Sequence, residues 1–366
     1  MTISTAASRV LIALIAFSLP SLGASSQLHG QGLTVKSRAP QKKKIETEET
    51  ASAAETKTDL QNRSNVDDKR YAKPAGVSYS NPVKNRWKIG VKVKNGSAEV
   101  RNAIFAFPIP RDWGEQSVSV VEEEIPAHAI VDESRIKKNS GLHQWVVRFP
   151  RLAPNEELMI TRTFLISTSQ IDPPVDVSVY TRPKSRNREA RDHMKVSPGI
   201  NFQDSKLRKQ VKEITRDKSN LWEEVESLYD WVRDNIDDFN SKPGPLDQTF
   251  KNRKGCNEDK VSLFVGMCRA HKIPARMVWV QGTIYAEFML NDPEGNGHWF
   301  PCNVGGVREF GSYSEPRIVL QKGDNYRIPE KEKTQKYVGE VFQGQIKSGN
   351  QRPRYVFFRQ LLPANE

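Results

Sequence analysis

The residue best suited to chemistry in this sequence is Cys256, which opens a predicted helix. It stands in the run Gly255-Cys256-Asn257-Glu258-Asp259, directly before an apolar stripe that predicts a helix over 257–270. At a helix start, unpaired backbone N–H groups and the helix dipole stabilise an anion, so a thiolate is favoured. Gly255 has no side chain, which lets a substrate or another part of the chain approach the sulfur closely. A cysteine in this setting can equally be a plain helix cap, so its wider context has to decide.

That context resembles the bacterial transglutaminase-like core. The resemblance rests on three runs with matching spacing, namely residues 254–259, Cys268-Arg269-Ala270, and Ile273-Pro274-Ala275-Arg276. It covers roughly residues 200–305. It implies an α+β fold of the papain-like type, with helices packed on an antiparallel sheet. The strands that precede this region resemble the immunoglobulin-like module often found before such cores.

The resemblance also implies a thiol mechanism. A cysteine attacks an amide or acyl carbonyl, a histidine accepts its proton, and an acidic residue orients the histidine. Cys256 matches the nucleophile, but Thr283 stands where the histidine is expected, at the start of Thr283-Ile284-Tyr285-Ala286-Glu287. Asn303, after Trp299-Phe300-Pro301-Cys302, replaces the aspartate. An asparagine can orient an imidazole, whereas a neutral hydroxyl takes no proton near pH 7. The sequence therefore predicts that Cys256, Thr283 and Asn303 converge in a cleft that has lost its base.

Two histidines are candidates to replace that base. His298 lies in the right region, but five residues before Asn303, so it should lie about 16 Å from it along a strand. His271 lies at the far end of the helix that Cys256 opens, about 22 Å away. His298 is therefore the only substitute worth testing.

The sequence contains two further cysteines, Cys268 and Cys302. Cys268 falls on the apolar stripe of its helix, and Cys302 points to the strand face opposite Asn303, so both are expected to be core thiols. The spacings of Cys256, Cys302 and His298 match no common zinc site. No metal and no other cofactor is expected.

The N-terminal part of the chain predicts export. Residues 1–24 have the layout of a secretory signal peptide, with an apolar run from Val10 to Leu22 that is too short for a membrane span. Residues 25–73 are polar and lack apolar periodicity, which predicts a disordered linker. We therefore expect a periplasmic or secreted protein with no integral membrane segment after cleavage.

The remaining chain predicts two domains. Residues 75–170 contain short alternating strands separated by turns, which predicts a β-sandwich. Residues 171–198 are basic and irregular and form a connector, and residues 199–362 form the transglutaminase-like core with C-terminal strands. The core is expected to contain helices near 207–214, 221–236 and 257–270, strands near 275–281, 283–290 and 298–304, and edge strands near 337–342 and 355–361.

Charge bears on the partners. The 366 residues carry 56 Lys plus Arg against 44 Asp plus Glu, a formal net charge of +12, and three cysteines are too few for a disulfide scaffold. The basic connector is either a solvated linker or a docking patch for an anionic envelope polymer. No nucleic-acid motif is present, and nothing in the sequence indicates an oligomeric state.

Three functions fit these observations. The first is a non-catalytic or weakly active transglutaminase-like protein that binds peptide or glycan in its cleft. The second is an active thiol amidase, protease or acyl transferase with a rearranged base. The third is a structural envelope protein. The loss of histidine at position 283 favours the first and third, and the retained Cys256 favours the first two.

Overall fold

The computed structural model describes residues 76–135, 141–184, 186–240, 242–328, 332–346 and 351–363. The predicted signal peptide (1–24) and polar linker (25–73) lie outside these residues. Within the part of the chain that is described, no helix combines the length and the apolar character that a membrane crossing requires.

The first half of the described chain is antiparallel β-structure. Its strands are β1 (Ser78–Lys94), β2 (Val100–Ile109), β3 (Gln116–Glu124), β4 (Ile130–Arg135), β5 (His143–Leu152) and β6 (Glu157–Asp172). Alternate residues of β1, such as Trp87 and Ile89, are buried while Lys92 and Lys94 are exposed, as the period-two pattern predicts. With β14 (Val341–Ile346) and β15 (Arg354–Leu362), these strands form two four-stranded sheets, β15-β1-β6-β3 and β14-β2-β5-β4. The buried side chains of the two sheets share one hydrophobic core.

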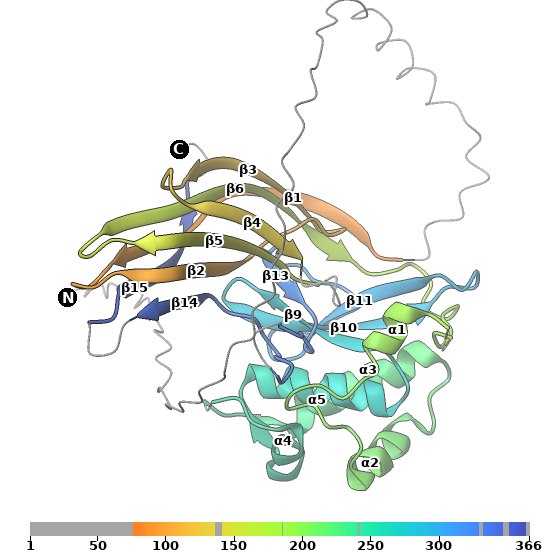
Figure 1. Cartoon of the computed structure of the whole chain (residues 1–366). Helices are drawn as coiled ribbons and strands as arrows, with labels where there is room; N and C mark the ends of the chain where they lie inside the picture. The colour runs from red at the N-terminus through yellow and green to blue at the C-terminus, as the bar shows by residue number, and fades with distance from the viewer. Residues whose placement is uncertain are drawn as a thin grey trace, which may run out of the picture. The chain divides into compact units, whose positions relative to one another are not determined.

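The two C-terminal strands correct the expected domain organisation. β14 (Val341–Ile346) and β15 (Arg354–Leu362) do not extend the C-terminal core but pair with β2 and β1 (Figure 1). Phe342 packs on Phe105 at a ring-centroid distance of 4.9 Å, and Phe357 packs edge-on against Phe107 at 5.2 Å. Strands from the C-terminal end of the sequence therefore complete the edges of the two N-terminal sheets.

The second half places helices on a further, five-stranded sheet. The helices are α2 (Ser205–Thr215), α3 (Leu221–Asn235), α4 (Leu246–Asn252) and α5 (Asn257–Ala270). Asn220 caps α3 by accepting a hydrogen bond from the backbone N–H of Glu223 at 2.9 Å, as the sequence predicts. α5 is buried on almost all sides because the sheet and the other helices surround it (Figure 1).

The five-stranded sheet has the order β12-β11-β10-β9-β13. Its strands are β9 (Ala275–Val280), β10 (Thr283–Asn291), β11 (Gly297–Asn303), β12 (Glu309–Phe310) and β13 (Val319–Lys322). Ile284, Ala286 and Phe288 of β10 pack into the same core as α5, whereas Tyr285 packs on the opposite face. A short parallel pair, β7 (Asp237–Asp238) with β8 (Lys254–Gly255), leads directly into α5.

The two halves of the described chain contact each other through strand β13 and the residue before it. All described residues fall in one compact unit. Strand β13 joins the halves: Ile318 and Leu320 pack into the N-terminal core, and Val319 exchanges two hydrogen bonds with the buried side chain of Gln116, at 2.7 and 3.1 Å. The basic connector also contains a short helix, α1 (Arg188–Asp192), capped by Asn187.

Candidate functional site

Cys256 lies at the N-cap of α5, half-buried, as the sequence predicts. The β7–β8 pair fixes the backbone just before it. Gly255 is required here because a Cβ atom at that position would lie 2.6 Å from Cβ of Asp259. The backbone at Gly255 therefore lies in close contact with the side chain of Asp259.

Asp259 is the hydrogen-bond partner of the thiol. Its Oδ2 accepts the backbone N–H of Cys256 at 3.0 Å and the Cys256 thiol at 3.2 Å, and its Oδ1 accepts the backbone N–H of Gly244 at 2.8 Å. The side chain is buried. The thiol is thus hydrogen-bonded to a carboxylate of its own helix and not to an imidazole.

This arrangement raises the pKa of the Cys256 thiol. Burial is the largest cause, and the hydrogen bond and negative charge of Asp259 act in the same direction. Backbone N–H groups of Asp259 and Glu258 oppose the shift but do not overcome it. The helix dipole alone predicts a slightly lowered pKa. The structure differs because burial, the largest effect, and the Asp259 carboxylate both act against the dipole.

Thr283 is held by the neighbour of Cys256. The side-chain amide of Asn257 donates to Thr283 Oγ1 and to the backbone oxygen of Ile284, both at 3.2 Å. The Oδ1 atom of Asn257 is buried and has no hydrogen-bond partner among the described residues. A Cβ on Gly305 would lie 2.0 Å from that oxygen. Asn257 is therefore wedged between the helix start, β10 and the loop after β11.

Asn303 turns toward its own loop. Its Oδ1 accepts the backbone N–H of Gly306 at 3.1 Å, and its Nδ2 donates to Glu309 Oε2 at 3.4 Å. Its backbone oxygen accepts from the Tyr229 hydroxyl at 2.9 Å and from Arg233 at 3.0 Å. Within the described chain no hydrogen bond links the side chains of Cys256, Thr283 and Asn303, although Asn257 connects the elements that carry them.

His298 does not replace the missing base. It lies at the opposite end of the β10–β11 hairpin, where it pairs with Leu290, and its Nε2 is 2.8 Å from Asp292 Oδ2. Leu290 is seven residues along β10 from Thr283, which corresponds to roughly 23 Å. The hypothesis of a substitute base at His298 is therefore wrong on geometry.

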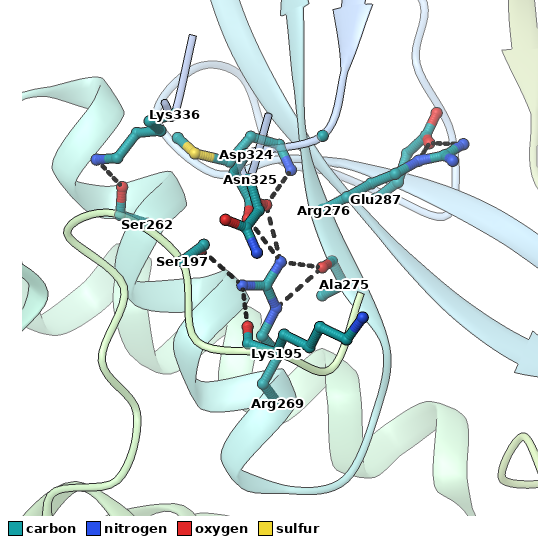
Figure 2. A network of polar contacts seen from close by, with 12 residues as sticks. Lys195, Ser197, Ser262, Arg269, Ala275, Arg276, Glu287, Asp324, Asn325 and Lys336 are labelled. Carbon is teal, nitrogen blue, oxygen red and sulfur yellow. Dashed lines mark hydrogen bonds and ion pairs between the residues drawn. The ribbon is translucent and has the colours of Figure 1, made fainter. Parts of the chain in front are cut away.

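The motif residues outside the cysteine have structural roles. Arg269 is buried, and its guanidinium binds both oxygens of Asp324 at 2.8 and 2.9 Å and the backbone oxygen of Ala275 (Figure 2). Arg276 pairs with Glu287 across β9 and β10 at 2.6 Å. Cys268 and Cys302 are fully buried, as predicted. These residues hold the helix and the sheet together.

A cavity of about 400 Å³ lies on the side of β10 where Glu287 points, opposite α5. Lys322 joins Glu287 to Glu115 at 2.6 Å each, and all three side chains are buried. Tyr79, Trp113 and Trp299 add aromatic surface. The sequence does not predict this cavity, because the cavity forms only where the N-terminal strands meet the five-stranded sheet. No cluster of at least three His, Cys, Asp or Glu side chains that could hold a metal ion occurs among the described residues.

Comparison with known proteins supports this reading of the core. Residues 208–304 match the model of the transglutaminase-like superfamily. This part of the chain is a transglutaminase-like core, in a mixed α/β structure with antiparallel sheets. A search of curated proteins found no match.

Two solved structures are similar. A candidate cysteine protease from Cytophaga hutchinsonii is 15% identical, with a TM-score of 0.49, covering 79% of this chain and 94% of that one. A candidate protease from Parabacteroides distasonis is 13% identical, with a TM-score of 0.27, covering 67% of this chain and 48% of that one.

Proposed function

We propose that this chain is an exported transglutaminase-like protein that no longer performs thiol catalysis and instead binds peptide or glycan. One observation carries the proposal. The Cys256 thiol donates to the Asp259 carboxylate at 3.2 Å, while Asn257 donates to Thr283, the residue that stands where the family has its histidine. The sulfur is thereby kept protonated, and only the thiolate is an effective nucleophile.

Asp259 is a poor substitute for the imidazole. An ordinary thiol and an ordinary carboxyl differ by about 4.6 pKa units, so moving the proton between them costs about 6 kcal/mol. A carboxylate beside the sulfur also repels the developing thiolate, whereas an imidazolium would attract it. Loss of a base typically costs a cysteine or serine enzyme several orders of magnitude in rate.

The 400 Å³ cavity supports the binding role. Its size falls in the range of small-molecule sites, and it combines aromatic surface with buried hydrogen-bonding groups. The charges that line it are already paired, as Arg276 with Glu287 and Lys322 with Glu115. A neutral ligand rich in hydroxyl or amide groups is therefore the favoured occupant. The proposed export rests on the signal-peptide pattern of residues 1–24.

An acylation assay tests the loss of catalysis. The full-length protein and Cys256→Ala are incubated with p-nitrophenyl acetate at pH 7, and release of nitrophenol is followed together with intact mass. We expect equal rates and no acetyl adduct on Cys256. A burst of nitrophenol that depends on Cys256, with an acetyl thioester on that residue, would show an active nucleophile and contradict the proposal.

A further inference from the structure

A second cavity, of about 680 Å³, lies between α1 and the turn that follows β13. Four cations line it, three from the α1 segment and one from the turn: Arg188, Arg191, Lys195 and Arg327. We call this feature the basic cleft. It shares no residue with the Cys256 site, and Arg269, which binds the walls of the cleft, lies 13 residues further along α5 than Cys256, about 20 Å away.

The carboxylates in the basic cleft are already committed to other groups. Asp324 is buried and gives both oxygens to Arg269. Asp192 pairs with Lys195 at 2.5 Å and with Arg188 at 4.0 Å. Among the described residues, no ion pair involves Arg191 or Arg327. The cleft therefore keeps an excess of positive charge directed at solvent.

The walls of the basic cleft are fixed to each other. The Nη1 atom of Arg269 donates to the backbone oxygen of Lys195 at 3.0 Å and to Ser197 Oγ at 2.9 Å. Its Nη2 atom donates to Asp324 (Figure 2). Glu189 of α1 accepts a hydrogen bond from the indole N–H of Trp299 in β11 at 2.8 Å, which joins α1 to the five-stranded sheet. The backbone that carries the four cations is thereby held in place, so binding does not have to order it.

We propose that the basic cleft binds an acidic polysaccharide whose sugars carry carboxylate groups. Three of the four cations are arginines, whose planar guanidinium group matches a carboxylate with two parallel hydrogen bonds. The floor adds uncharged polar groups, the Asn325 amide and the His193 imidazole. Burial, with a contribution from Arg276, lowers the pKa of His193 to about 3, so this ring is neutral near pH 7. Uncharged donors and acceptors between cations suit a chain of alternating hydroxyls and carboxylates better than a plain polyphosphate.

The proposal is tested by titrating the full-length protein with an oligogalacturonate of defined length at several salt concentrations. The test variant carries Arg188→Gln, Arg191→Gln and Arg327→Gln. The control removes three exposed cations from α2, with Lys206→Gln, Arg208→Gln and Lys212→Gln, so both variants have the same net charge. All six side chains lie at exposed positions, and circular dichroism checks that both variants keep the fold.

We expect at least a tenfold weaker Kd for the cleft variant, a smaller dependence of binding on salt, and an almost unchanged Kd for the control. Equal weakening in both variants would show a non-specific effect of net charge and overturn the proposal. Polyphosphate of matched charge that binds the wild type as tightly as oligogalacturonate would overturn the assignment to sugars. Absence of binding at low salt would also overturn it. None of these results depends on the reactivity of Cys256, so failure here is distinguishable from failure of the proposed function.

Discussion

The Cys256 thiol donates a hydrogen bond to the carboxylate of Asp259, one turn along the same helix, at 3.2 Å. The same carboxylate accepts the backbone N–H of Cys256 at 3.0 Å. A carboxylate that caps the helix, and not an imidazole, is thus the hydrogen-bond partner of this thiol. The helix start favours the thiolate, but burial and this carboxylate favour the thiol, and the latter effects prevail.

Asp259→Asn should make Cys256 more reactive. The amide keeps a hydrogen-bond acceptor but removes the negative charge, so the pKa of the thiol falls and alkylation at pH 8 becomes several-fold faster. Iodoacetamide labelling with peptide mapping measures the rate. Glu258→Gln is the matched control, because this carboxylate lies in the same helical turn but pairs with Lys336 at 3.1 Å. An unchanged rate in Asp259→Asn would mean that its carboxylate does not control the sulfur.

Restoring a histidine should require two changes. Thr283→His alone should leave the alkylation profile nearly unchanged, because the Asn257 amide occupies the space next to Thr283 Oγ1. Combined with Asn257→Ala, the imidazole gains room at the start of α5, and alkylation should extend to lower pH. Asn257→Ala alone is the control. Full activation by Thr283→His alone would show that Asn257 does not block the position.

Glu287→Gln should destabilise the protein by about 3–5 kcal/mol, because it leaves the buried Arg276 without its close buried carboxylate and leaves Lys322 with Glu115 alone. Chemical denaturation measures the loss. Glu157→Gln is the control, since its ion pair with Lys94 is exposed and should contribute less than about 1 kcal/mol. A loss below 1 kcal/mol in Glu287→Gln would contradict the anchoring role.

The same variant carries a pH dependence. Burial acts to raise the pKa of Glu287, but the charges of Arg276 and Lys322 outweigh burial and hold it below its ordinary value. A carboxyl whose pKa is depressed in the folded state stabilises the protein above its unfolded pKa of about 4.3, and this contribution is lost as the pH falls through the folded value. The Tm difference between wild type and Glu287→Gln should therefore be constant from pH 5 to 7 and shrink below pH 4. A difference that grows in acid would contradict this sign.

Phe342→Ala should destabilise the N-terminal sheets by up to about 3 kcal/mol, because Phe342 of β14 packs on Phe105 of β2. Denaturant unfolding followed by Trp fluorescence measures the effect. Val356→Ala on β15 is the control, since that side chain is 66% exposed and its loss should change stability by no more than about 0.5 kcal/mol. Equal stability of both variants would argue against the observed pairing of β14.

The local elements of this fold could be predicted from the sequence, and the long-range partners could not. The helix from Asn257 to Ala270 has the predicted bounds because a cap precedes it and Pro274 follows it closely. The apolar run at 355–361 predicted β15 closely, whereas the run at 337–342 overlaps β14 only at its first two residues. The partners of both strands could not be predicted, because any open sheet edge with an apolar face satisfies the same pattern.

The candidate site shows the same limit. The resemblance to the transglutaminase-like family pointed to Cys256, Thr283 and Asn303, and the structure places the elements that carry them around Asn257. The resemblance did not point to Asp259 as the thiol partner, although a cap followed three residues later by an acid is the pattern of a capping box. The family pattern concerns the histidine position only, whereas the Asp259 carboxylate is explained by local capping of the helix.

The most direct test of an inactive Cys256 is the pH dependence of its alkylation in the unmodified protein. Iodoacetamide is applied from pH 5 to 10, and peptide mapping separates Cys256 from the buried Cys268 and Cys302. We predict negligible labelling of Cys256 at pH 5 to 6 and a rise only above the titration of an ordinary thiol, since its pKa is raised. Rapid labelling of Cys256 at pH 5 would show a stabilised thiolate and contradict the account.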